Sequence, residues 1–157
     1  GKVKIMDEGY GITNGPIINQ DQTVLYHTDS QRGIVYKFTL QPKEPILIEK
    51  EVFLQFNPTV AVPDGMCFDK DGNIYIAIWG GGSVNKYSEF GELMYSFKLP
   101  VINVTNVCYG GESLDRLFVT SAHNNDSMNH LLNNKNGNVF EIIDHNSQGV
   151  IMNEFVL

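Results

Sequence analysis

Residues 62–87 read VPDGMCFDKDGNIYIAIWGGGSVNKY and contain two Asp-Gly pairs, Asp64-Gly65 and Asp71-Gly72. The second pair stands between the strand-like runs CFD and NIYIAI, which is the sequence signal of a β-hairpin turn. The first pair instead follows Pro63 and precedes its strand. Two interpretations of Asp64 are therefore open: a second turn residue, or a carboxylate placed for chemistry.

The rest of the chain shows the same pattern of short β-branched and aromatic runs bounded by Gly, Asn, Asp and Pro, and almost no helical periodicity. We therefore expect an all-β protein. The predicted strands are 24–28, 34–40, 46–54, 66–69, 74–78, 83–87, 93–99, 117–121 and 138–143.

Three segments follow one plan, in which a polar residue precedes an apolar strand, a turn, a second strand, and a third strand that begins near a Gly. A fourth strand follows in each unit, in EPILIEKEVFL, GELMYSFKLP and QGVIMNEFVL. Four strands in a unit of roughly 40 to 50 residues are typical of a β-propeller blade. The sequence thus predicts blades over residues 10–55, 56–100 and 101–157, with residues 1–6 as the outer strand of a preceding blade.

Three blades do not close a ring, because propellers use about four to eight. The preferred interpretation is that the chain is the C-terminal half of a six-bladed propeller. Two alternatives are that two copies assemble, or that a separate partner supplies the remaining blades.

The composition excludes some functions. Eighteen acidic residues against eleven basic ones give a net charge of −7, which disfavours a nucleic-acid partner. No apolar run approaches the ~20 residues of a membrane helix and no signal segment opens the chain, so we expect a cytoplasmic protein. Cys67 and Cys108 lie in apolar segments and are expected to be free, buried thiols.

In a propeller, polar residues at the starts of the innermost strands converge on the central channel. Aligning the units on Ile17, Cys67 and Cys108 makes Asn14, Asp64 and Thr105 equivalent, and a slip of one residue replaces Thr105 with Asn106. Amide and carboxylate oxygens are hard ligands that suit Ca²⁺ or Mg²⁺, with Zn²⁺ and Mn²⁺ as further options.

Three segments resemble the senescence marker protein/gluconolactonase family, also called regucalcin-like: TNGPIINQDQTVLYHTDSQRGIVYKF at 13–38, VPDGMCFDKDGNIYIAIWGGGSVNKY at 62–87 and TNVCYGGESLDRLFVTSA at 105–122. The resemblance runs through most of the chain and covers roughly the C-terminal half of that fold. It implies a six-bladed propeller that binds one divalent cation on its axis, most readily Ca²⁺, and hydrolyses sugar or related lactones. Some members of the family cleave organophosphates.

Carried over by resemblance, Asn14 matches the metal-binding Asn of the family, and Asp64 matches its metal-binding Asp, often regarded as the general base. The first metal ligand of the family, a Glu in an E-G-P motif, has no counterpart here, and neither do its substrate-binding Arg and Asn. His123 stands where the family usually has an Arg-Asp-Gly segment and could border the channel mouth.

The resulting hypothesis is metal-dependent hydrolysis of a small lactone, with Asp64 as ligand and catalytic residue, and with the N-terminal half of the propeller or a second copy as partner. Thr105, Asn106 and His123 are weaker candidates for substrate contacts. The alternative is a propeller fragment that binds a cation or is purely structural, without turnover.

Overall fold

The computed structural model describes residues 2–41, 47–123 and 135–151. These residues form an all-β structure, as predicted, with one short 3₁₀ helix, η1 (Ser30–Arg32). Within the described ranges, no helix is long and apolar enough to cross a membrane. The strands are β1 (Thr13–Ile18), β2 (Val24–Asp29), β3 (Ile34–Leu40), β4 (Leu47–Gln55), β5 (Val62–Phe68), β6 (Ile74–Trp79), β7 (Ser83–Tyr87), β8 (Leu93–Lys98), β9 (Val104–Gly110), β10 (Arg116–Ser121) and β11 (Val139–Ile142).

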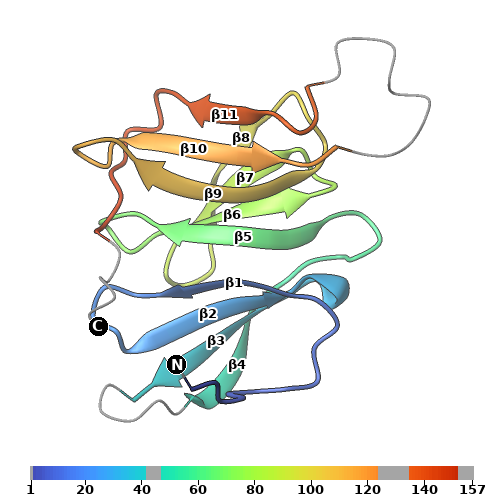
Figure 1. Ribbon diagram of the computed structural model, residues 1–157, viewed down its shortest axis with the longest axis vertical. Helices are drawn as coiled ribbons and strands as arrows, with labels where there is room; N and C mark the ends of the chain where they lie inside the picture. The colour runs from blue at the N-terminus through green and yellow to red at the C-terminus, as the bar shows by residue number, and fades with distance from the viewer. Residues whose placement is uncertain (1, 42–46, 124–134, 152–157) are drawn as a thin grey trace.

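The strands form three antiparallel sheets, each of which pairs strands in chain order. We call β1–β4 blade 1, β5–β8 blade 2 and β9–β11 blade 3. The first strand of each sheet is innermost: β5 contacts both β1 and β9, and all three run in the same direction (Figure 1). Because they are aligned, their N-terminal ends lie at one end of the stack, where η1 also contacts β5 (Figure 1).

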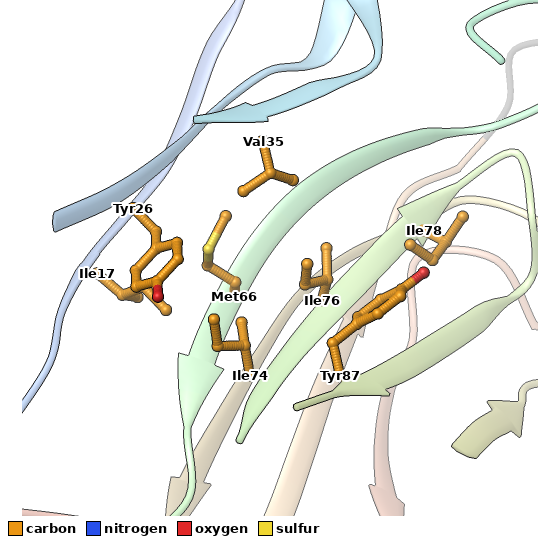
Figure 2. Close-up of a cluster of buried hydrophobic side chains, with 8 residues drawn as sticks. All are labelled: Ile17, Tyr26, Val35, Met66, Ile74, Ile76, Ile78 and Tyr87. Atoms are coloured by element: carbon orange, nitrogen blue, oxygen red, sulfur yellow. The ribbon is translucent and has the colours of Figure 1, made fainter. Parts of the chain in front are cut away.

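The blades stack through apolar faces. Strand β6 is central, and its alternate residues serve two different cores, which explains why IYIAI is apolar throughout rather than alternating with polar residues. Figure 2 shows the first core, in which Ile74, Ile76 and Ile78 face blade 1. Tyr75 and Ala77 point the other way and pack with blade 3.

The predicted strands are present with small shifts at their ends, but the innermost strands were underestimated. Strand β5 begins at Val62 rather than at Met66, so Asp64 and Gly65 lie inside it. Strands β1 and β9 were implied by the repeat, yet were not among the predicted strands. Polar residues and Gly in β1 and β9 interrupt the apolar pattern of the sequence. The backbone pairing with the neighbouring strand nevertheless continues through these residues.

Both ends of the chain differ from the prediction. Within the described part of the chain, residues 2–6 form no strand, and Val3 is 99% exposed. Residues 148–151 form no fourth strand of blade 3. Gly149 instead bridges to Asp69 in blade 2, and its N–H donates to the carbonyl oxygen of Leu114 at 2.8 Å. The remainder of that predicted strand, 152–157, lies outside the described residues.

Candidate functional site

All three innermost strands carry an irregularity near their N-terminal ends. In β1 the pairing register shifts between Asn14, opposite Thr28, and Ile17, opposite Tyr26. Two residues therefore face one across the sheet, which is a β-bulge, and bulges change the direction in which side chains point.

The corresponding shifts in the other two blades fall on the other candidate residues. In β5 the register shifts between Pro63 and Met66, so the bulge contains Asp64 and Gly65. In β9 the pairing passes from Val104 to Asn106, and Thr105 is the extra residue. In β1 the bulge instead contains Gly15 and Pro16, directly after Asn14, so a bulge lies within one position of each aligned residue.

This geometry resolves the two Asp-Gly pairs. Asp71 and Gly72 form the turn between β5 and β6, with Gly72 at a φ of +81°, and the Asp69 carboxylate accepts the N–H groups of Asp71 and Asn73 at 3.0 and 2.9 Å. Asp64 and Gly65 make no turn, because they lie in the ladder of β5. The interpretation of Asp64 as a second turn residue is therefore wrong.

Asn14 is linked to blade 2 through Ser30, a buried residue of η1. The Asn14 amide lies 3.2 Å from the Ser30 hydroxyl, and that hydroxyl donates to the carbonyl oxygen of Pro63 at 2.7 Å. Two hydrogen bonds thus connect the Asn14 side chain with the residue that precedes Asp64.

The carboxyl group of Asp64 is partly buried. Burial raises its pKa to about 6, although the N–H of Gly65 acts in the opposite direction. Among the described residues, no Lys or Arg forms an ion pair with it. A metal ion could bind to an ionised carboxylate that has no cationic partner and lies near an amide side chain.

In blade 3 the structure distinguishes Asn106 from Thr105. The Thr105 hydroxyl pairs with that of Thr120 at 2.7 Å, within its own blade. Asn106 lies directly against Gly65, where an added Cβ would be 2.1 Å from Asn106 Oδ1. The blade 3 residue brought against the bulge of β5 is therefore Asn106, as in the alignment slipped by one position.

His123 is exposed and follows β10, just beyond Ala122, whose N–H donates to Asn103 at 2.9 Å. This bond places His123 at the end of blade 3 where β9 begins. Of the other histidines, His27 is buried in blade 1, where it stacks on Phe38, and burial lowers its pKa.

The candidate donor set contains a single charged group. Across the described residues, no group of three or more His, Cys, Asp or Glu side chains could hold a metal ion. The candidate ligands are therefore one carboxylate, Asp64, and the amide oxygen of Asn14.

Sequence reasoning missed Ser30. Its sequence context, DSQR, is that of an ordinary turn, and nothing in it indicates a contact with Pro63, 33 residues away. Cys108 also differs from expectation, because it is exposed. Its neighbour Val107 faces the core, so the alternation of a strand turns Cys108 to the opposite face.

A hollow of about 450 Å³ extends along the innermost strands. Gly15, Met66, Cys67, Asn106 and Cys108 are among the residues that line it. It therefore adjoins the bulges of all three blades and is large enough for a small molecule.

Comparison with known proteins relates this arrangement to one family. A family model described as SMP-30/Gluconolactonase/LRE-like region matches residues 1–123. The pentonolactonase of Haloferax volcanii is 34% identical over 122 residues, covering 78% of this chain and 42% of the relative. Regucalcin of Bos taurus is 28% identical over 141 residues, covering 88% and 47%. The chain spans less than half the length of these curated relatives.

Two solved structures share the fold. A luciferin-regenerating enzyme superposes with a TM-score of 0.82 at 28% identity, over 95% of this chain and half of the other. The calcium-binding regucalcin of Agrobacterium tumefaciens superposes with a TM-score of 0.85 at 26% identity, over 93% and 50%. These neighbours confirm that the sheets are blades of a regucalcin-like propeller. With a family model that matches most of its length, the chain belongs to the SMP-30/gluconolactonase/LRE-like family.

Proposed function

We propose that this chain forms about half of a propeller that hydrolyses a sugar lactone or a related lactone with the help of one divalent cation. The observation that carries the proposal is the unpaired, partly buried carboxyl group of Asp64, in a bulge that adjoins Asn106 and is linked through Ser30 to Asn14. Membership of a family that includes a pentonolactonase supports the choice of substrate class.

The residues fit a hard cation. Asn14 and Asp64 would hold it through oxygen atoms, and such a donor set suits Ca²⁺ best, followed by Mg²⁺, Zn²⁺ or Mn²⁺. When bound, the cation would polarise the lactone carbonyl and make a nearby water more acidic. Ligands beyond these two would come from blades outside this chain, supplied by the same polypeptide or by a second copy.

Asp64 is the candidate general base. With a pKa of about 6 in the cation-free protein, its carboxyl group is mostly ionised at neutral pH and can accept a proton from the attacking water. The water oxygen forms a bond with the lactone carbonyl carbon, the ring C–O bond breaks, and the proton passes from Asp64 to the departing alkoxide. The product is a hydroxy acid. Cation binding weakens the basicity of Asp64, so the ligand role and the base role compete.

The second candidate is a cation-binding propeller without turnover. It is favoured by the donor set, which contains a single carboxylate, and by the lack of a counterpart to the E-G-P Glu and the substrate-binding Arg of the family. A calcium-binding regucalcin is among the structural neighbours.

Lactone hydrolysis measured by pH-stat, on the natural polypeptide that contains this chain, separates the two candidates. We expect Asp64→Ala to lower kcat/KM by about 10²-fold to 10⁴-fold, as loss of a general base does, and a chelator to abolish turnover. Asp71→Ala is the matched control, because it removes an exposed Asp from the Asp-Gly pair that forms a turn.

Equal rates for all three proteins, with and without chelator, would exclude the enzymatic proposal. Calcium binding that is lost in Asp64→Ala, without turnover of any lactone, would establish the second candidate instead.

A further inference from the structure

Ser30 connects two blades through a single hydroxyl group. It is 6% exposed and is the first residue of η1, at the end of the stack where β1 and β5 begin (Figure 1). Its oxygen lies 3.2 Å from Asn14 Nδ2 in blade 1 and 2.7 Å from the carbonyl oxygen of Pro63 in blade 2.

The single hydrogen atom of the Ser30 hydroxyl determines which atom of the Asn14 amide group faces it. A serine hydroxyl has one hydrogen, and a backbone carbonyl can only accept. The Ser30 hydrogen is therefore committed to Pro63, and the Ser30 oxygen can only accept from Asn14. The Asn14 atom that faces Ser30 must then be its NH₂ group, which leaves Oδ1 free for another partner.

Ser30 is itself held firmly. Its N–H donates to the carbonyl oxygen of Ile12 at 2.9 Å. The carboxylate of Asp29 caps η1 by accepting the Arg32 N–H at 3.3 Å, and it accepts the N–H groups of Gly11 and Ile12 at 3.4 Å. The segment that leads into β1 and the segment that presents Ser30 are thus tied to one buried carboxylate.

The Pro63 bond acts on the other candidate ligand. Pro63 immediately precedes Asp64 and lies at the edge of the bulge in β5. A hydrogen bond to its carbonyl oxygen fixes the backbone from which Asp64 projects. One hydroxyl group therefore orients the first candidate ligand and anchors the second.

We propose that Ser30 is a positioning residue for cation binding, which turns Asn14 Oδ1 toward the ion and fixes the spacing between the bulges of blades 1 and 2. This inference rests on the proposed function, since it assumes that Asn14 and Asp64 hold a cation. It adds a residue that contacts neither the cation nor the substrate.

The test measures the Kd for Ca²⁺ by titration calorimetry, on the natural polypeptide and its variants. Ser30→Ala removes both hydrogen bonds, and we expect the affinity to fall about 10-fold, the effect typical of losing a partner that orients a metal ligand. Ser30→Thr keeps the hydroxyl and should restore affinity to within about 3-fold of wild type. In the Asn14→Ala background, Ser30→Ala should change the Kd for Ca²⁺ much less, because the side chain through which Ser30 mainly acts on the cation is absent.

Two controls separate this role from a merely structural one. Ser83→Ala removes another buried serine, which is 2% exposed and lies at the start of β7. It should leave the Kd for Ca²⁺ unchanged whatever it does to the melting temperature. In metal-free protein, the NMR signals of the Asn14 NH₂ group should shift in Ser30→Ala and not in Ser83→Ala.

The outcomes are distinguishable. If Asn14→Ala and Asp64→Ala both weaken Ca²⁺ binding while Ser30→Ala binds as wild type does, the role of Ser30 is overturned and the proposed function stands. If neither Asn14→Ala nor Asp64→Ala changes binding, or if wild type binds no divalent cation, both proposals fall. If Ser30→Ala fails to fold, Ser30→Thr decides. Asn14 NH₂ signals that move away from their wild-type positions, together with a wild-type affinity for Ca²⁺, would overturn the inference.

Discussion

Gly65 of blade 2 and Asn106 of blade 3 touch so closely that any side chain at position 65 would have to displace the side chain of Asn106. A Cβ on Gly65 would lie 2.1 Å from Asn106 Oδ1 and 2.9 Å from Asn106 Cβ. The backbone of Gly65 does not have a positive φ, so the requirement comes from space and not from conformation. Strands β5 and β9 can therefore approach this closely because Gly65 has no side chain.

Gly65→Ala should destabilise the protein by about 1–3 kcal/mol, the usual cost of overpacking. Urea unfolding at neutral pH measures the change. Asn106→Gly in the same chain should recover most of the loss, whereas Asn106→Ala should recover less, because its Cβ remains in contact. A loss that persists in the Gly65→Ala/Asn106→Gly double variant would contradict the contact.

Asp64 makes the stability of the cation-free protein depend on pH. Its pKa is raised from 3.8 to about 6, so the folded state favours the protonated form. The stabilising contribution is fully present below about pH 4 and is lost as the pH rises through 6. Asp64→Asn, which resembles the protonated form, should therefore be more stable than wild type at pH 8 and equally stable at pH 4. Urea unfolding with chelator present measures this difference, and an equal gain at both pH values would contradict it.

Asp29 should show the opposite sign. Burial raises its pKa, but the N–H groups of Gly11, Ile12 and Arg32 and the Arg32 guanidinium outweigh burial and lower it overall. Its contribution to stability is present above pH 3.8 and is lost as the pH falls below that value. Asp29→Asn should cost about 1–3 kcal/mol at pH 7 and clearly less at pH 3. Unfolding free energies at the two pH values test this, and an identical loss at both would refute it.

The two cysteines should differ in reactivity. Cys108 is exposed, whereas Cys67 is less accessible and burial raises the pKa of its thiol. With a thiol reagent at pH 8, this chain should show one fast-reacting thiol and a second that reacts more slowly. Cys108→Ser should remove the fast phase and Cys67→Ser should leave it. Two equally fast thiols in the native chain would disprove the assignment.

Ile76 tests the core between blades 1 and 2. It is 0% exposed and lies among side chains of both blades (Figure 2). Ile76→Ala should cost about 2–5 kcal/mol and Ile76→Val about 0.5–1.5 kcal/mol, because the cost grows with the cavity left behind. Chemical denaturation measures both, with Val3→Ala, at a 99% exposed position, as the control. A cost below about 1 kcal/mol for Ile76→Ala would show that the interface is not packed as described.

The sequence by itself determined the all-β fold and the order of the strands, because local patterns carry both. The hairpin at Asp71-Gly72 and the continuous apolar run of β6 could be recognised without coordinates, since a turn and a strand buried on both faces each depend on adjacent residues. The repeat also made Asn14 and Asp64 equivalent, because each lies one position before a Gly near the start of the first strand of its blade.

Only the tertiary structure decided which residues of different blades meet. It placed Asn106 rather than Thr105 against Gly65, turned Cys108 away from the core, and joined Ser30 to Pro63 across 33 positions. Each outcome depends on where a bulge adds one residue to a strand and on how closely two sheets approach. A shift of one residue reverses the face of every side chain that follows, and no local pattern in the chain records the distance between blades.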